Sequence, residues 1–110
     1  METITVHAKF SKAVLKEINI DQFHSGTYQP RDSFSEESLE SLTKTIIQLG
    51  ILEPLIVRIS PINPAQYEIV AGERRWRAAK LAGLRVVPCL VANYSNEQAA
   101  QVALIENACR

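Results

Sequence analysis

The sequence predicts an α/β domain in which a small mixed sheet is flanked by helices. Short apolar runs bounded by proline or glycine, such as residues 55–59 and 67–70, are typical of strands. Other segments carry apolar residues at steps of three and four, which is the spacing of an amphipathic helix. Because these two patterns alternate along the chain, we expect strands and helices to be interleaved in one domain.

Composition limits the possible functions. The 110 residues predict one domain with a modest core, and 46% hydrophobic and 22% charged residues are ordinary values for a folded globular protein. Twelve basic and twelve acidic residues give zero net charge, which argues against a domain that grips a nucleic-acid backbone by itself. The sequence has neither a run of about 18 apolar residues nor a leader, so we expect no membrane span and a cytoplasmic location.

The N-terminal third contains a segment without a clear pattern, followed by a predicted strand and a proline-stiffened segment. Residues 1–17 show no firm period and are expected to form an arm or a weak first element, with the domain spanning residues 18–110. Alternation over residues 17–21 predicts a short strand. A loop then leads to Gln29 and Arg31, which flank a proline that stiffens the segment and presents both side chains.

A helix followed by a hairpin is predicted next. Ser33 or Ser35 can cap the helix, and Gly50 closes it. Its apolar stripe consists of Leu39, Leu42, Ile46 and Leu49. The strands at residues 55–59 and 67–70 are expected to pair as a hairpin, because prolines and an asparagine between them indicate a turn.

The stretch from Gly72 onward changes from strand to helical spacing and carries the main functional signal. Gly72 can adopt backbone angles closed to other residues and leaves room for a ligand near the main chain. The helix that follows begins with unpartnered amides and a dipole that favours an anion. Arg74, Arg75 and Arg77 surround this start with guanidinium groups, which suit phosphate oxygens. Together these features predict a phosphate site.

Two alternatives remain open for this stretch. Glu73 could orient a metal-bound water, or it could simply pair with an arginine. The whole segment could also be a surface helix with a basic face and a buried stripe of Trp76, Ala79 and Ala82.

The C-terminal part predicts a strand, a capped helix and a second functional cluster. Pro88 suggests that the strand over residues 86–91 lies at an edge or has an unbonded position. Ser95 and Gln98 fit the reciprocal capping pattern of a last helix. On that helix Glu106, Asn107 and Arg110 can share one region of surface. The carboxylate and amide oxygens suit magnesium, although an exposed Glu106–Arg110 ion pair is an alternative.

The cysteines and histidines give no independent site. Cys89 and Cys109 have neither a CxxC partner nor a histidine cluster, and both are expected to be packing residues. His7 and His24 stand alone in polar surroundings, so we expect both to be exposed and uninvolved.

Three separated patches together resemble the N-terminal domain of the ParB family of chromosome and plasmid partition proteins. The resemblance runs from about Ile18 to the last residue. The matching segments are Gln29-Pro30-Arg31, the passage from Leu49 to Leu55, the specific motif from Gly72 to Ala78, and Glu106-Asn107 with Arg110. It implies the ParB/sulfiredoxin fold, although sulfiredoxin activity is set aside because that enzyme needs a reactive cysteine in the phosphate-binding turn.

The resemblance implies a nucleotide switch that binds CTP with Mg²⁺ and hydrolyses it weakly. Gly72 and the following amides would hold the triphosphate with Arg74 and Arg75, and Glu73 would support hydrolysis. Glu106 and Asn107 would approach the magnesium. Gln29, Arg31, Arg77 and Arg110 are further candidates for nucleotide binding, and residues 50–54 would lie near the base.

The family also implies partners. A dimer would close as a clamp on centromere-like DNA in the nucleoid, through a helix-turn-helix and a dimerisation segment expected beyond residue 110, and a ParA-type ATPase would contact the N-terminal arm. Two departures from the family pattern bear on base preference: the longer approach over residues 23–28, and Glu53 where glutamine is common. The alternatives are a non-catalytic interaction module and another phosphoryl-transfer or nuclease enzyme on the same fold.

Overall fold

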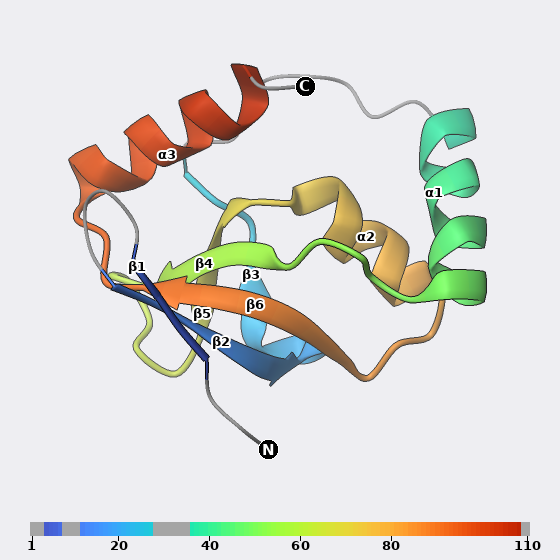
Figure 1. Ribbon diagram of the computed structural model, residues 1–110, viewed down its shortest axis with the longest axis horizontal. Coiled ribbons are helices and arrows are strands. Elements are labelled where there is room, and N and C mark those ends of the chain that lie inside the picture. Colours follow the sequence, from blue (N-terminus) through green and yellow to red (C-terminus); the bar gives the residue numbers. More distant parts are fainter. Residues whose placement is uncertain (1–3, 8–11, 28–35, 109–110) are drawn as a thin grey trace.

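The computed structural model describes residues 4–7, 12–27 and 36–108, which form a sheet and three α-helices (Figure 1). The strands are β1 (Ile4–His7), β2 (Lys12–Asn19), β3 (Phe23–His24), β4 (Leu55–Ile59), β5 (Tyr67–Ala71) and β6 (Val86–Ala92). The helices are α1 (Glu36–Leu49), α2 (Glu73–Leu81) and α3 (Asn96–Ala108), with a short 3₁₀ helix at Ile20–Gln22. The predicted α/β class is confirmed.

The sheet is mixed and has the strand order β1-β2-β6-β4-β5-β3. β4 and β5 form the predicted antiparallel hairpin, whereas β6 runs parallel to β4 and β3 runs parallel to β5. Because parallel strands end at the same edge of a sheet, the residues after β3 and those after β5 emerge on the same side of the molecule.

Helices cover both faces of this sheet, because consecutive residues of the strands point to opposite faces. Leu55 and Val57 belong to a core that also contains Ala79 of α2. Ile56, which lies between them, packs into a second core with Ala99 of α3. The sheet therefore lies between α2 and α3, as the expectation of flanking helices required.

The N-terminal strands correct the expected boundary between an arm and a domain. β2 pairs with β6 from Ala13 to Asn19, so the sheet continues across residues 17 and 18. Its two buried side chains, Ala13 and Ile18, belong to the two different cores. This burial pattern lacks the alternation by which a half-buried strand is recognised in a sequence. The strand expected at residues 17–21 ends at Asn19, whose side chain caps the 3₁₀ helix.

Of the two alternatives for Pro88, the edge strand is wrong, and a position without a pairing partner on one side agrees with the structure. β6 lies between β2 and β4 in the sheet. Pro88 is opposite Glu17 of β2, but the pairing with β4 begins only at Cys89. The proline therefore lies in an interior strand at a position that β4 does not reach.

The predicted cap of α3 is confirmed, whereas the predicted apolar stripe of α1 is only partly buried. The capping pattern of α3 is confirmed, since Gln98 N donates to Ser95 Oγ at 3.1 Å and Ser95 N donates to Gln98 Oε1 at 3.0 Å. In α1, Ile46 is buried as expected, but Leu49 is 63% exposed and does not join the core. The proposed capping residues of α1, Ser33 and Ser35, lie outside the described residues.

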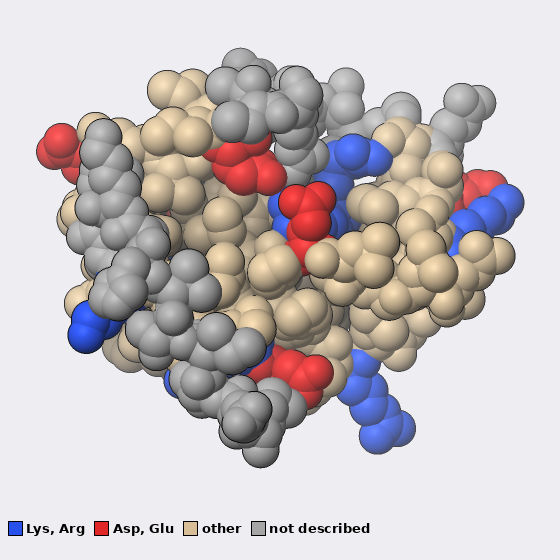
Figure 2. Space-filling model, in the orientation of Figure 1, with Lys and Arg blue, Asp and Glu red and all other residues tan. Residues whose placement is uncertain are grey.

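Charged side chains of both signs lie on the surface, as the zero net charge leads one to expect. On the face shown in Figure 2, acidic and basic side chains are interspersed among uncharged ones. Among the described helices, we find none with the length and apolar character that crossing a bilayer requires.

Cys89 gives a direct test of the core. It is fully buried, and burial raises the pKa of its thiol from 9.0 to about 12. Since the thiolate is the reactive form, we expect the folded Cys109→Ser variant to react with a thiol reagent at pH 8 far more slowly than the same variant in denaturant. Equal rates would contradict the burial. Raising the pH from 9 toward 12 should also lower the free energy of unfolding, because only the unfolded chain then releases this proton.

Candidate functional site

The turn between β5 and α2 is built around Gly72. Its φ is +108°, and a Cβ added there would lie 2.7 Å from Cδ2 of Leu55. The backbone angle therefore favours glycine, and any other residue would also force the buried Leu55 side chain to shift. Gly72 provides no side-chain cap for α2, so the first turn of the helix keeps the amides that can receive an anion.

Glu73 lies directly after this turn and is buried, with 4% exposure. Its Oε2 accepts hydrogen bonds from Ser25 Oγ at 2.8 Å and from Arg77 Nε at 3.3 Å. Its Oε1 is buried and has no hydrogen-bond partner among the described residues. Since an unpaired buried carboxylate oxygen is costly, this atom marks a place for a water or a ligand.

The three arginines of α2 have different surroundings. Arg75 donates to the carbonyls of Glu53 and Pro54 at 3.2 and 2.5 Å, and to Glu106 Oε2 at 3.1 Å. Arg77 pairs with Glu73, as described above. Arg74 donates to the hydroxyl of Ser38 in α1, and within the described part of the chain it has no carboxylate partner. Of the three, Arg74 is the guanidinium whose charge is least compensated.

The contact between Arg75 and Glu106 brings the start of α2 next to the end of α3. The structure thus places two of the three sequence patches side by side. Glu106 pairs with α2, whereas the alternative ion pair with Arg110 lies outside the described residues, as do Gln29 and Arg31. Asn107 belongs to α3, but its side chain is not among those described. The described residues contain no cluster of three or more His, Cys, Asp or Glu side chains able to hold a metal.

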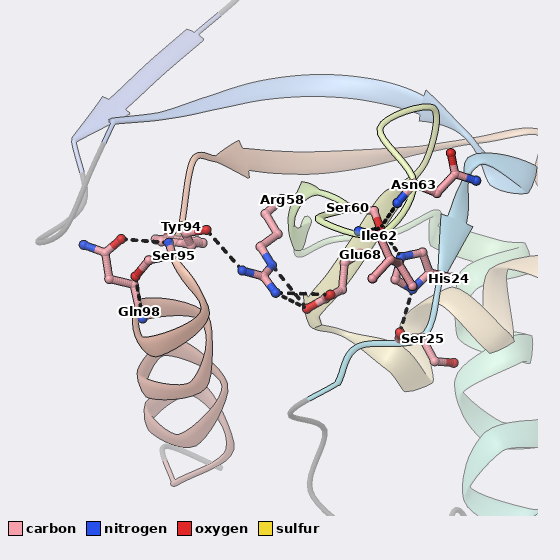
Figure 3. A network of polar contacts seen from close by, with 10 residues as sticks. All are labelled: His24, Ser25, Arg58, Ser60, Ile62, Asn63, Glu68, Tyr94, Ser95 and Gln98. Carbon is pink, nitrogen blue, oxygen red and sulfur yellow. Dashed lines mark hydrogen bonds and ion pairs between the residues drawn. The ribbon is translucent and has the colours of Figure 1, made fainter.

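His24, which the sequence predicted to be exposed and uninvolved, is half-buried and belongs to a polar network (Figure 3). His24 Nε2 lies 2.7 Å from Ser60 Oγ, and Nδ1 lies 2.9 Å from the carbonyl of Ser25. Ser60 Oγ already accepts bonds from the amides of Ile62 and Asn63. Its proton is therefore available for Nε2, and the pattern assigns the remaining ring proton to Nδ1. The ring fixes the position of Ser25.

A second part of the network is a buried ion pair between the strands of the hairpin (Figure 3). Arg58 and Glu68 face each other across β4 and β5, with exposures of 3% and 1%. Arg58 bonds both carboxylate oxygens at 3.2 Å and also donates to the carbonyl of Tyr94, just before α3. The pair thus ties the start of α3 to the hairpin.

Sequence reasoning missed these network residues for identifiable reasons. Arg58 and Glu68 could have been found by assuming the register of the predicted hairpin, which places them opposite each other. Nothing in the sequence indicates that Ser25 contacts Glu73, because 48 positions separate them.

The profile of the ParB N-terminal domain family matches residues 5–108 of this chain. The chain belongs to the ParB N-terminal domain family. The relatives include a probable chromosome-partitioning protein ParB from Coxiella burnetii, which is 46% identical over 97 residues, or 88% of this chain and 32% of the relative. The chain therefore spans about a third of the length of the curated relatives that it matches.

Solved ParB structures have the same fold. Truncated ParB from Caulobacter crescentus complexed with CTP-γ-S superposes with a TM-score of 0.83 at 43% identity, covering 87% of this chain and 53% of that one. The same protein complexed to the centromeric parS site superposes with a TM-score of 0.74 at 41% identity, covering 86% of this chain and 48% of that one. Sulfiredoxin from Arabidopsis thaliana superposes with a TM-score of 0.61 at 19% identity, covering 87% of this chain and 97% of that one. At this identity the similarity shows a shared fold alone.

The buried ion pair of this ParB-family domain can be tested by stability. Arg58→Met should lower the free energy of unfolding by about 3–5 kcal/mol, because it leaves the Glu68 charge buried and unpaired. The double variant Arg58→Met/Glu68→Leu removes both charges and should recover most of the loss. Urea unfolding of both variants measures the difference. A single variant as stable as the double would contradict the assignment.

Proposed function

We propose that this domain binds CTP at the start of α2 and acts as the nucleotide-responsive part of a partition protein. The observation that carries the proposal is Glu73, a buried carboxylate with one unpartnered oxygen beside an arginine cluster and an uncapped helix start. A 43% identical ParB in complex with CTP-γ-S supports the choice of nucleotide.

The phosphates would bind at the amides after Gly72 and at Arg74. Arg74 is the strongest candidate because its described partner is a neutral hydroxyl, so a phosphate would gain an uncompensated guanidinium. Arg75 would contribute from its place between α3 and the loop before β4, and Arg77 from the helix surface. Gln29, Arg31 and Arg110 complete the proposed nucleotide set, with residues 50–54 near the base.

Magnesium fits this arrangement through Glu106, with Asn107 as the second proposed ligand. Mg²⁺ commonly keeps several waters and uses only one or two carboxylates together with substrate phosphates, so the site does not need a cluster of acidic residues. When bound, the ion would neutralise charge on the phosphate oxygens.

We further propose that Glu73 supports slow hydrolysis of CTP to CDP and phosphate. The oxygen of a water molecule would bond to the γ-phosphorus as the bond from that phosphorus to the β–γ bridging oxygen breaks. CDP would leave with the electron pair, and Oε1 of Glu73 would accept a proton from the water. The positive charge of Arg74 would stabilise the phosphoryl oxygens during this step.

In the proposed setting, the domain belongs to a dimer that forms a clamp on centromere-like DNA and works with a ParA-type ATPase in the cytoplasm. A ParB relative complexed to the parS site supports the DNA partner. The domain has equal numbers of acidic and basic residues, which supports the proposal that other parts of a longer protein bind the DNA backbone.

Calorimetric titration with CTP, ATP, GTP and UTP, each with and without Mg²⁺, tests this proposal. We expect selective, magnesium-dependent binding of CTP. Arg74→Ala should weaken it about 10- to 100-fold, because a charge-assisted contact to phosphate is lost.

Arg85→Ala is the matched control, since Arg85 is an exposed arginine just before β6 and outside the proposed site. It should bind CTP like the unmodified chain. Absence of CTP binding, or equal losses in both variants, would contradict the proposal.

A further inference from the structure

The contact between Ser25 and Glu73 joins two segments that meet because of the sheet topology. β3 runs parallel to β5, with His24 opposite Glu68. Ser25 follows β3 directly, and Glu73 follows β5 after a single turn residue. Both therefore emerge at the same edge of the sheet, where ligands commonly bind in α/β folds.

The two oxygens of the Glu73 carboxylate are not equivalent. Oε2 accepts the hydroxyl of Ser25 and the Nε of Arg77, whereas Oε1 is buried without a described partner. Two bonds to one oxygen fix the plane of the carboxylate and leave the other oxygen for chemistry. A general base works only when its accepting atom is held within hydrogen-bond reach of the proton that it removes.

Ser25 is better placed than Arg77 to fix this orientation. The Ser25 bond is the shorter, at 2.8 Å against 3.3 Å. Arg77 lies on the same helix as Glu73, one turn later, and Ser25 and Arg77 are both exposed residues. Ser25 comes from a different element, and the ring of His24 fixes its carbonyl and thereby its backbone.

We propose that Ser25 is a positioning residue for CTP hydrolysis, which it promotes by holding Oε2 of Glu73 so that Oε1 faces the attacking water. Oε1 then accepts the proton of that water while its oxygen bonds to the γ-phosphorus and the bond to CDP breaks. This inference rests on the proposed function. It adds that hydrolysis and nucleotide binding depend on different residues, since Ser25 contacts the carboxylate whereas Arg74 would contact the phosphates.

Ser25→Ala tests the inference, with phosphate release and CTP titration measured in parallel on the full chain with Mg²⁺. We expect kcat to fall about tenfold or more, because a carboxylate that is no longer held in position removes the proton of the water more slowly. KM and the calorimetric affinity should change by less than about twofold. Ser25→Thr keeps a hydroxyl at the same position and should retain kcat within about threefold.

Ser41→Ala is the control, because it makes the same change at an exposed serine of α1 and should leave all values unchanged. Unaltered kcat in Ser25→Ala, or equal losses of affinity and rate, would overturn the role of Ser25. An unmodified chain that binds CTP without releasing phosphate would overturn it as well. Failure of the proposed function is distinct, because the unmodified chain would then bind no CTP.

Discussion

The candidate site depends on the close approach of the chain to Leu55 at Gly72. With a φ of +108°, and with Cδ2 of the buried Leu55 only 2.7 Å from where a Cβ would lie, the chain turns from β5 into α2 without a capping side chain. This turn determines where every later residue of the motif lies. Glu73 enters the interior, Arg74 points to α1, and Arg75 reaches α3. A larger residue at this turn would adopt a strained backbone angle and displace the Leu55 side chain, which lies in the core beside α2.

Charge in the motif is compensated unevenly among the described residues. Arg75 has a carboxylate and two carbonyls as partners, so it already holds the loop before β4 and the end of α3 together. Arg77 compensates part of the Glu73 charge. Within the motif, Arg74 has a neutral hydroxyl as its described partner, and Oε1 of Glu73 is buried without a described partner. A phosphate and a water molecule are the partners that would satisfy them.

Local patterns predicted local structure. Ser95 and Gln98 are three residues apart, and their reciprocal cap follows from that spacing alone. The glycine turn and the helix after it were also predictable, because positive φ and helical periodicity are properties of short segments. β2 was not, since its burial pattern reflects two cores on opposite faces. The contact on which the role proposed for Ser25 rests joins residues 48 positions apart, and no periodicity of the sequence contains it.

Nucleotide is proposed to bind where α2 begins, and backbone amide chemical shifts test this binding site most directly. In a titration of isotope-labelled protein with CTP and Mg²⁺, we expect the largest changes at Gly72 and the first turn of α2, with smaller changes at Ser25 and at the end of α3. Amide protons that bond phosphate should shift most, since they gain a charged acceptor. Changes confined to β2 or to the loop between β4 and β5, with the first turn of α2 unaffected, would contradict the account.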